Sequence, residues 1–235
     1  RLVSYADGIS VSNKFLQKKF QGVLLPHCRD TTVLDPMKFD SDKIKEKMGF
    51  KNKRVVMFLG TPRPHKGLDD LLSAFEKIKD LNLKLVIIGV ENQQEFLNKI
   101  DQSIKESVVV LPKTPFQKLP ELLSIADIIV IPQRRTSDSV GQIPARLFDA
   151  MSMAKPIIAT RISDIPEVLD GCGYLVDPNN PSQIVDAIQY ILNHSDEARV
   201  KGDAARARCR QKYDISNLES GLRGLIEQIT EKKVI

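Results

Sequence analysis

The sequence has no tryptophan, only three histidines and only three cysteines among its 235 residues. The cysteines are Cys28, Cys172 and Cys209, and their spacing fits neither a disulfide framework nor a zinc site. The histidines are equally scattered, which argues against a metal cluster and against a histidine-based nucleophile arrangement. We therefore predict a protein of a reducing, cytoplasmic compartment with no metal site.

Long apolar runs and blocks of like charge are also missing. No apolar stretch approaches the roughly 20 residues that a membrane-spanning helix requires, and no signal peptide opens the chain. Basic stretches interleaved with aromatic residues do not occur, so we expect no binding to nucleic acid. The 35 Lys and Arg exceed the 30 Asp and Glu only slightly, giving a net charge of +5. A solvated surface explains this excess, which also suits a phosphate-bearing ligand or an anionic membrane face.

From residue 54 onward, short apolar runs alternate with amphipathic segments. The runs are continuously apolar, as expected for strands that are covered on both faces of a sheet. Helices are predicted over Lys66–Asp80, Ala145–Met153 and Pro181–Asn193, the last with Asn180 as its N-cap. Repeated strand–helix–strand units predict an α/β fold with a Rossmann-like, doubly wound parallel sheet. The predicted strands are Val55–Leu59, Lys84–Ile88, Val108–Leu111, Ile128–Ile131, Ile157–Ala159 and Gly173–Val176.

Residues 1–35 read as a separate small unit, with strands at Gly8–Val11 and Gly22–Leu25 around a helix at Asn13–Phe20. This unit is too small to bury a core alone, and the chain begins with Arg1, so we expect a fragment of a longer protein. Residues 36–53 read as a linker, and residues 54–235 as the main domain. The charged helical stretch Asp196–Lys233 is expected on the flank of that domain.

The loop at residues 60–67 follows the first predicted strand of the sheet. Ligands of open parallel sheets bind beyond the carboxyl ends of the strands, where this loop lies. Gly60 allows a sharp turn, while Arg63 and Lys66 bring cations beside a helix N-terminus, which suits a phosphate or diphosphate. A turn with two surface cations is the plainer interpretation.

Two further loops are candidates for the same site. Residues 133–144 carry small polar side chains ahead of a predicted helix, so their amides suit an oxyanion. Asp149 lies inside that helix, within reach of a ligand hydroxyl pair, although alone it would be an ordinary solvated residue. The loop at residues 112–115 has backbone groups for a planar base, or is a proline-stiffened turn. Neither a P-loop nor a G-x-G-x-x-G motif follows the first strand, which argues against a dinucleotide-binding dehydrogenase.

Several short pieces of the chain occur in the order and spacing of one known family. They are Ala6-Asp-Gly-Ile-Ser-Val-Ser12, Leu25-Pro-His-Cys-Arg-Asp30, Gly60…Lys66-Gly67…Ala74-Phe75, Leu85–Gly89, Ala126-Asp127…Pro132, Asp149-Ala-Met…Lys155-Pro-Ile-Ile-Ala159 and Ile165-Pro-Glu-Val…Gly173–Pro178. Read together, they resemble the C-terminal, donor-binding half of a GT-B fold glycosyltransferase of the retaining family 4 type.

The resemblance implies a nucleotide-diphosphosugar as donor substrate, with no cofactor and no obligatory metal. Lys66 would bind the donor diphosphate and polarise the leaving group, Asp149 would hold the ribose hydroxyls, and the backbone near Lys113 would meet the base. The remaining positions assigned to the donor are Gly60, Thr61 and the amides of Val140, Gly141, Gln142 and Ile143, which would hold phosphate oxygens. Stabilising the departing diphosphate is the important chemical step, because charge accumulates there as the glycosidic bond breaks.

Two positions depart from the family pattern. Thr61 stands where the family usually has arginine, and we expect the nearest cation, Arg63, to replace it in catalysis. Gly141 stands where the family has the first of two glutamates, so the sugar contact expected there is lost. Arg146, two residues after Pro144, is similar to the P-x-K variant of some branches.

We therefore expect the donor domain of a retaining, hexosyltransferase-type enzyme, joined to the last unit of an acceptor-side domain. The acceptor would be a glycan, a lipid-linked molecule or a small molecule held by the missing half, and the basic C-terminal helix allows peripheral membrane contact. This chain alone should bind nucleotide and transfer little sugar. Two alternatives stay open: a GT-B-like sugar-nucleotide epimerase, and a non-catalytic nucleotide-sugar-binding or scaffold domain.

Overall fold

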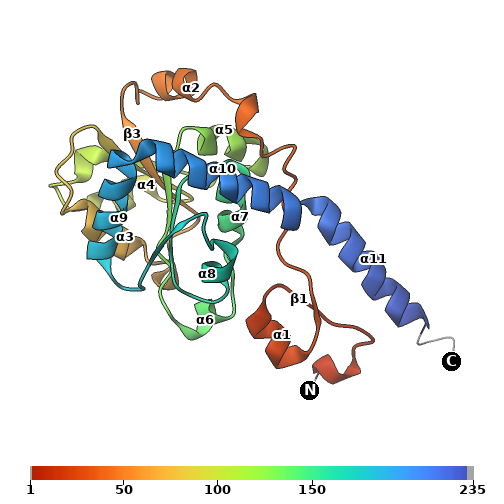
Figure 1. The fold of residues 1–235 in the computed structure, drawn as a ribbon. Coiled ribbons are helices and arrows are strands. Elements are labelled where there is room, and N and C mark those ends of the chain that lie inside the picture. Colours follow the sequence, from red (N-terminus) through yellow and green to blue (C-terminus); the bar gives the residue numbers. More distant parts are fainter. Residues whose placement is uncertain (1, 232–235) are drawn as a thin grey trace.

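The computed structural model describes residues 2–231 and contains a six-stranded sheet in which all paired strands are parallel. The strand order is β5-β4-β3-β6-β7-β8, and helices cover both faces (Figure 1). The strands are β3 (Arg54–Leu59), β4 (Leu83–Ile88), β5 (Val108–Leu111), β6 (Ile128–Ile131), β7 (Ile157–Thr160) and β8 (Tyr174–Val176). Each lies within one residue of its predicted bounds, and the predicted doubly wound α/β fold is confirmed.

Two apolar layers fill the space between the sheet and its helices. Along β3, Val55 and Met57 belong to one layer, while Val56 and Phe58 belong to the other, as the alternation of side chains along a strand requires. The first layer includes residues of α5 (Leu119–Ser124), α7 (Ala145–Ser152), α8 (Ile165–Val168) and α10 (Ser195–Lys212), with partly buried residues of α2 (Ser41–Lys47). The second includes residues of α3 (Leu68–Phe75) and α9 (Pro181–Asn193), with partly buried residues of α4 (Gln93–Asn98).

The loops after β3 and β6 approach each other closely at the carboxyl edge of the sheet. Gly67 has φ +68°, and a Cβ there would lie 1.8 Å from the carbonyl oxygen of Pro132. The predicted helix at Lys66–Asp80 begins later for this reason: a 3₁₀ turn (Pro64–Lys66) precedes Gly67, and α3 begins at Leu68. It also ends earlier, at Phe75, where the Lys77 and Ile78 amides turn to the carbonyl oxygens of Ala74 and Phe75. Since the chain leaves β3 and β6 toward opposite sides of the strand order, this edge is the topological switch point of the sheet.

The N-terminal residues form a separate two-stranded parallel sheet, β1 (Ser10–Val11) and β2 (Val23–Leu24), with α1 (Lys14–Phe20) between the strands. The helical stretch predicted at Asp196–Lys233 consists of two helices, α10 and α11 (Ile215–Glu231), and the carboxylate of Asp214 caps the second by accepting from the Ser216 amide. The predicted end at Lys233 lies outside the described residues.

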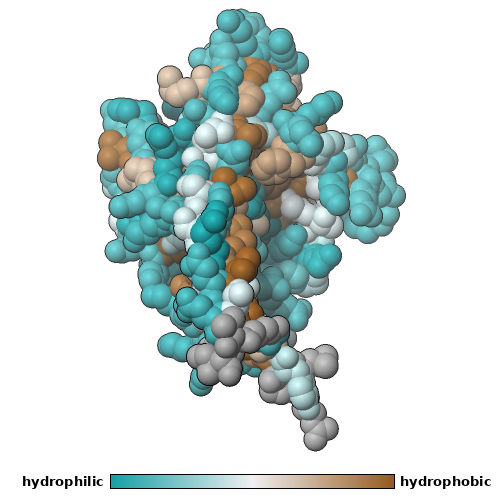
Figure 2. All heavy atoms as spheres, turned by 90° about the vertical axis from the view of Figure 1, so that its right-hand side faces the viewer, coloured by the Kyte–Doolittle hydropathy of each residue, from teal (hydrophilic) through white to brown (hydrophobic). Residues whose placement is uncertain are grey.

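Helices α10 and α11 have different packing partners. Helix α10 packs on α7 at the flank of the main domain, as expected, whereas α11 extends away from the sheet beside the N-terminal unit (Figure 1). Leu225 and Ile229 of α11 contact Gly8, and Leu25 contacts Gly221. Figure 2 shows an apolar strip between hydrophilic surfaces on this side of the molecule. No helix within residues 2–231 has the length and apolar character needed to cross a bilayer.

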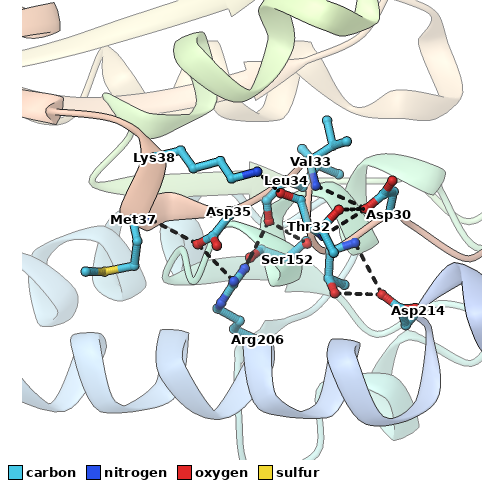
Figure 3. A network of polar contacts seen from close by, with 11 residues as sticks. Asp30, Thr32, Val33, Leu34, Asp35, Met37, Lys38, Ser152, Arg206 and Asp214 are labelled. Carbon is cyan, nitrogen blue, oxygen red and sulfur yellow. Dashed lines mark hydrogen bonds and ion pairs between the residues drawn. The ribbon is translucent and has the colours of Figure 1, made fainter.

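The segment after the N-terminal unit is tied to the main domain by buried and partly buried polar groups (Figure 3). Arg206 of α10 donates to the carbonyl oxygens of Leu34 and Ser152 and forms a 2.9 Å ion pair with Asp35. Nearby, the Thr31 hydroxyl donates to Asp214 at 2.6 Å. These contacts fix residues 31–35, just before the predicted linker, against α7 and α10.

Candidate functional site

A cavity of about 360 Å³ opens at the switch point of the sheet. We call it the switch-point cavity. It is lined by residues from the loops after β3, β4, β5 and β6 and from the first turns of α7, among them Gly60, Thr61, His65, Lys66, Gly89, Lys113, Thr114, Gln133, Gln142, Pro144, Ala145, Arg146 and Asp149. The topology thus brings together loops that lie up to 90 residues apart in the sequence, as is usual for ligand sites of doubly wound sheets.

The cavity collects six of the ten residues predicted for the site, namely Gly60, Thr61, Lys66, Lys113, Gln142 and Asp149. Four are not among its lining residues. Arg63 is exposed on the outer side of the β3 loop, and Ile143 is a core residue that is 4% exposed. Gly141 lies against the ring of Phe15 in α1, and its carbonyl oxygen accepts from the Asn13 side chain at 2.6 Å. Val140 ends the short helix α6 (Ser137–Val140).

The backbone amides in the loop before α7, which were expected to bind phosphate oxygens, have other hydrogen-bond partners. The Val140 amide donates to Thr136 at 3.1 Å, and the amides of Gly141 and Gln142 donate to Ser139, because α6 forms in this loop. These groups are already hydrogen-bonded and are not free for a phosphate. The helix end at the cavity wall is that of α7, which begins at Ala145 and whose first amides have no partner within the helix.

Lys66 has a strongly electropositive environment. Its Nζ lies 3.2 Å from the point that a Cβ on Gly60 would occupy, and Nη1 of Arg146 lies 3.3 Å from the same point. Burial, and after it the neighbouring charges of Arg146 and Arg63, together lower the pKa of Lys66 to about 8. At pH 7 the amine is therefore still mostly protonated and ready to receive an anion.

Arg146 also lines the cavity, although its sequence position indicated only a variant of a family motif. It lies in the first turn of α7, 7% exposed, and its Nη1 donates to the Leu59 carbonyl oxygen at 2.7 Å. Its guanidinium carbon is 4.9 Å from the centre of the Phe58 ring. Burial lowers its pKa to about 10, so it stays charged at neutral pH. In the sequence, the apolar positions around Arg146 in the predicted helix are the sign that this arginine is buried.

Asp149 is buried about one turn into α7. Its Oδ1 accepts from Nε of Arg29, a residue of the segment that follows β2. Burial raises the pKa of the Asp149 carboxyl, and the charge and hydrogen bond of Arg29 partly oppose that rise. The sequence offered no sign of this partner, since 120 residues separate the two side chains.

A bidentate ion pair supports the loops on the opposite side of the cavity. Arg134, after β6, binds both carboxylate oxygens of the buried Asp70 in α3, at 2.7 and 2.8 Å. The amide of Arg134 also donates to the His65 carbonyl oxygen at 2.8 Å. The position of Lys66 thus depends on contacts that join α3 to the β6 loop. Within residues 2–231, no group of three or more His, Cys, Asp or Glu residues is arranged to hold a metal ion.

This chain is similar in sequence to known glycosyltransferases. Residues 40–208 match the family described as "Glycosyl transferases group 1". The chain is 26% identical over 222 residues to a GDP-mannose-dependent alpha-(1-6)-phosphatidylinositol monomannoside mannosyltransferase of Mycolicibacterium smegmatis, covering 88% of this chain and 58% of that one. It is 25% identical over 184 residues to an N-acetyl-alpha-D-glucosaminyl L-malate synthase of Bacillus anthracis, covering 75% and 46%. The chain spans about half the length of the curated relatives it matches.

Solved structures share the arrangement of the sheet. HepE of Anabaena, in complex with UDP and glucose, superposes with a TM-score of 0.82 at 16% identity, covering 95% of this chain and 64% of that one. The C-terminal domain of a group 1 glycosyl transferase, LpcC of Francisella tularensis, superposes with a TM-score of 0.66 at 22% identity, covering 80% and 99%. The fold is thus the Rossmann-like fold of GT-B glycosyltransferases, and with the match over residues 40–208 this chain belongs to the group 1 glycosyl transferases.

Proposed function

We propose that this chain is the donor-binding domain of a retaining glycosyltransferase, and that the switch-point cavity holds the diphosphate of a nucleotide-diphosphosugar. The observation that carries the proposal is the cationic pocket beside Gly60, where the half-buried Lys66 faces the cavity. Among the described residues, no carboxylate forms an ion pair with Lys66, and its neighbours in charge are cations. Such a pocket favours an anionic ligand with several oxygen atoms.

The proposed chemistry follows from where charge develops. As the bond between the sugar and the diphosphate breaks, negative charge gathers on the phosphate oxygens. Lys66 and the first-turn amides of α7 are held in fixed positions around the cavity, so they stabilise that charge without reorganising. The acceptor hydroxyl forms the new bond to the anomeric carbon, its proton passes to the departing phosphate oxygen, and the nucleoside diphosphate leaves.

The nucleoside end is assigned to the other side of the cavity. Lys113 and Thr114 at its rim have backbone groups for a base, and Asp149 lies at its inner wall. Because Oδ1 of Asp149 accepts from Arg29, we propose that Oδ2 accepts from a ribose hydroxyl. Arg29 would then orient the carboxylate and keep it ionised against the effect of burial.

Relatives support the class of donor. The M. smegmatis relative is named for GDP-mannose, and HepE is described with UDP, with UDP and glucose, and with UDP-glucose. These donors differ in base and sugar and share the diphosphate, which is the part that Lys66 would recognise. An acceptor, whether a glycan, a lipid-linked molecule or a small molecule, would come from the side of the N-terminal unit.

Calorimetric titration of the chain with UDP, GDP and ADP, without added metal, tests the proposal. We expect micromolar binding of one nucleotide, its loss in Lys66→Ala, and no change in Lys99→Ala, where a surface lysine pairs with Glu95 on α4. No binding of any of the three by the wild-type chain would contradict the proposal. A binding that vanished on addition of EDTA would contradict the metal-free site.

Transfer is measured on the full-length protein with the nucleotide sugar that the titration selects. We expect a new glycosidic bond whose anomeric configuration, read by NMR, is that of the donor. A free epimerised sugar nucleotide as the product would instead identify an epimerase.

A further inference from the structure

Arg146 is a buried charge with unfilled hydrogen-bonding capacity. Its Nε and Nη2 have no hydrogen-bond partner among the described residues, while Nη1 donates to the Leu59 carbonyl oxygen. Its contact with the Phe58 ring compensates only part of the charge. Burying a guanidinium with two unused donors is costly, so a partner for them is expected in the functional state.

Arg146 also shares its surroundings with a second cation. It lines the switch-point cavity, and its Nη1 and the Nζ of Lys66 lie 3.3 and 3.2 Å from the point that a Cβ on Gly60 would occupy. Gly60 has no side chain to fill that point, and its φ of +117° strongly disfavours any other residue there. Two like charges held side by side repel each other unless an anion lies between them.

We propose that Arg146 is the second cation of the diphosphate site, and that it binds phosphate oxygens together with Lys66 at the space beside Gly60. This inference rests on the proposed function, since it assigns a ligand within the same cavity. The planar guanidinium offers two parallel N–H groups to one phosphate, which a lysine does not. It also keeps its charge at pH values where Lys66 begins to lose its own.

The assignment replaces Arg63 as the substitute for the arginine expected at Thr61. Arg63 is exposed and does not line the cavity, whereas Arg146 is fixed inside it by the Leu59 carbonyl oxygen and the Phe58 ring. A cation already held in position loses less conformational freedom on binding than a mobile surface arginine does.

Calorimetry with inorganic pyrophosphate and with the nucleoside diphosphate that the chain binds distinguishes the two arginines. We expect Arg146→Gln to weaken both ligands by at least about tenfold, the factor that one lost charge-assisted hydrogen bond produces. Arg146→Lys should recover part of the loss. Arg135→Gln, an equal charge change at an exposed residue of the same edge, should change affinity less than about twofold.

If Arg146→Gln folds poorly, a second measurement on Arg146→Lys is used. In Arg146→Lys, the pKa of Lys66 should fall when pyrophosphate is removed and rise when it is added, as read from the NMR signal of the lysine side chain. An unchanged affinity in Arg146→Gln, or an equal loss in Arg63→Gln, would overturn the inference while nucleotide binding lost in Lys66→Ala upheld the proposed function. Failure of the wild-type chain to bind either ligand would overturn both.

Discussion

Lys66 and Arg146 show how single residues set the electrostatics of this site. Lys66 is partly buried and Arg146 is buried, each approaches Gly60, and neither has a carboxylate partner within residues 2–231. Charge of one sign in a partly dry cavity destabilises the ligand-free fold and increases affinity for an anion. The charges of Lys66 and Arg146 therefore lower the stability of the ligand-free chain and raise its affinity for an anion.

The affinity for a nucleoside diphosphate should depend on pH through Lys66. Its pKa without ligand is about 8, so the amine is charged at pH 7 and loses its proton as the pH rises. We expect constant affinity between pH 7 and 7.5 and a loss approaching about tenfold per pH unit well above 8. Calorimetry at pH 7 and 9 measures this, with Lys66→Arg as the control whose affinity stays level. Equal affinity of the wild-type chain at both pH values would contradict the prediction.

Replacing Lys66 with a neutral residue should stabilise the free chain at neutral pH. The pKa in the folded chain, about 8, is below the ordinary 10.5, so the unfolded chain binds more protons between these values. Wild-type stability should therefore rise with pH across that window, and the advantage of Lys66→Met should shrink. Urea unfolding at pH 7 and 9.5 measures both curves, and a variant less stable than wild type at pH 7 would disagree.

Among the elements, α3 and the β6 loop act as one support for the cavity. Gly67 lets the two loops meet at the Pro132 carbonyl oxygen, and the Asp70–Arg134 pair holds them together. Because the pair is bidentate and Asp70 is buried, its loss leaves a buried carboxylate without its main partner. We therefore expect the position of Lys66 to change when the Asp70–Arg134 pair is broken.

Arg134→Gln should lower the free energy of unfolding by about 1–3 kcal/mol, the range for hydrogen bonds to a charged group. Arg135→Gln, at the exposed neighbouring position, should change it by less than about 0.5 kcal/mol. Urea unfolding of the two variants at pH 7 makes the comparison. Equal effects would show that Asp70 does not depend on this partner.

At the scale of the whole molecule, Arg206 joins the main domain to the segment that leads to the N-terminal unit. Its contacts with Leu34, Asp35 and Ser152 are mostly shielded from water, with 16% of the Arg206 side chain exposed (Figure 3). On the other side of the same segment, Arg29 binds Asp149. Movement of the N-terminal unit would therefore shift Arg29 and, with it, Asp149 at the inner wall of the cavity.

Arg206→Gln should lower the free energy of unfolding by about 2–3 kcal/mol, because two carbonyl oxygens and Asp35 lose a charged donor together. The matched control is Arg210→Gln, on the exposed side of the same helix, with an expected change below about 0.5 kcal/mol. Adding Asp35→Asn to Arg206→Gln should cost less than Asp35→Asn alone. Additive costs in that double-mutant cycle would argue against the ion pair.

The sheet, the order of its elements along the chain and much of the core follow from local sequence patterns. Strands such as Val108–Leu111 and Ile128–Ile131 are short apolar runs between helices, and apolar burial follows such local patterns. The sequence also indicated Lys66 and Asp149, because the ends of parallel strands and the starts of helices are where ligands bind. These features depend on residues close together in the chain.

Which charged side chains are buried, and which groups they contact, depends on the folded arrangement of distant segments. Arg146 looks like a surface residue in the sequence, and its isolation depends on Leu59, Phe58 and Gly60, some 87 residues earlier. The same holds for Arg29 at Asp149 and for α11, which packs on the N-terminal unit instead of the sheet. The amides at residues 140–142 are hydrogen-bonded in and just after α6, whose first turn is capped by Thr136 and Ser139. Desolvation is a property of the assembled fold, so no local pattern of residues contains it.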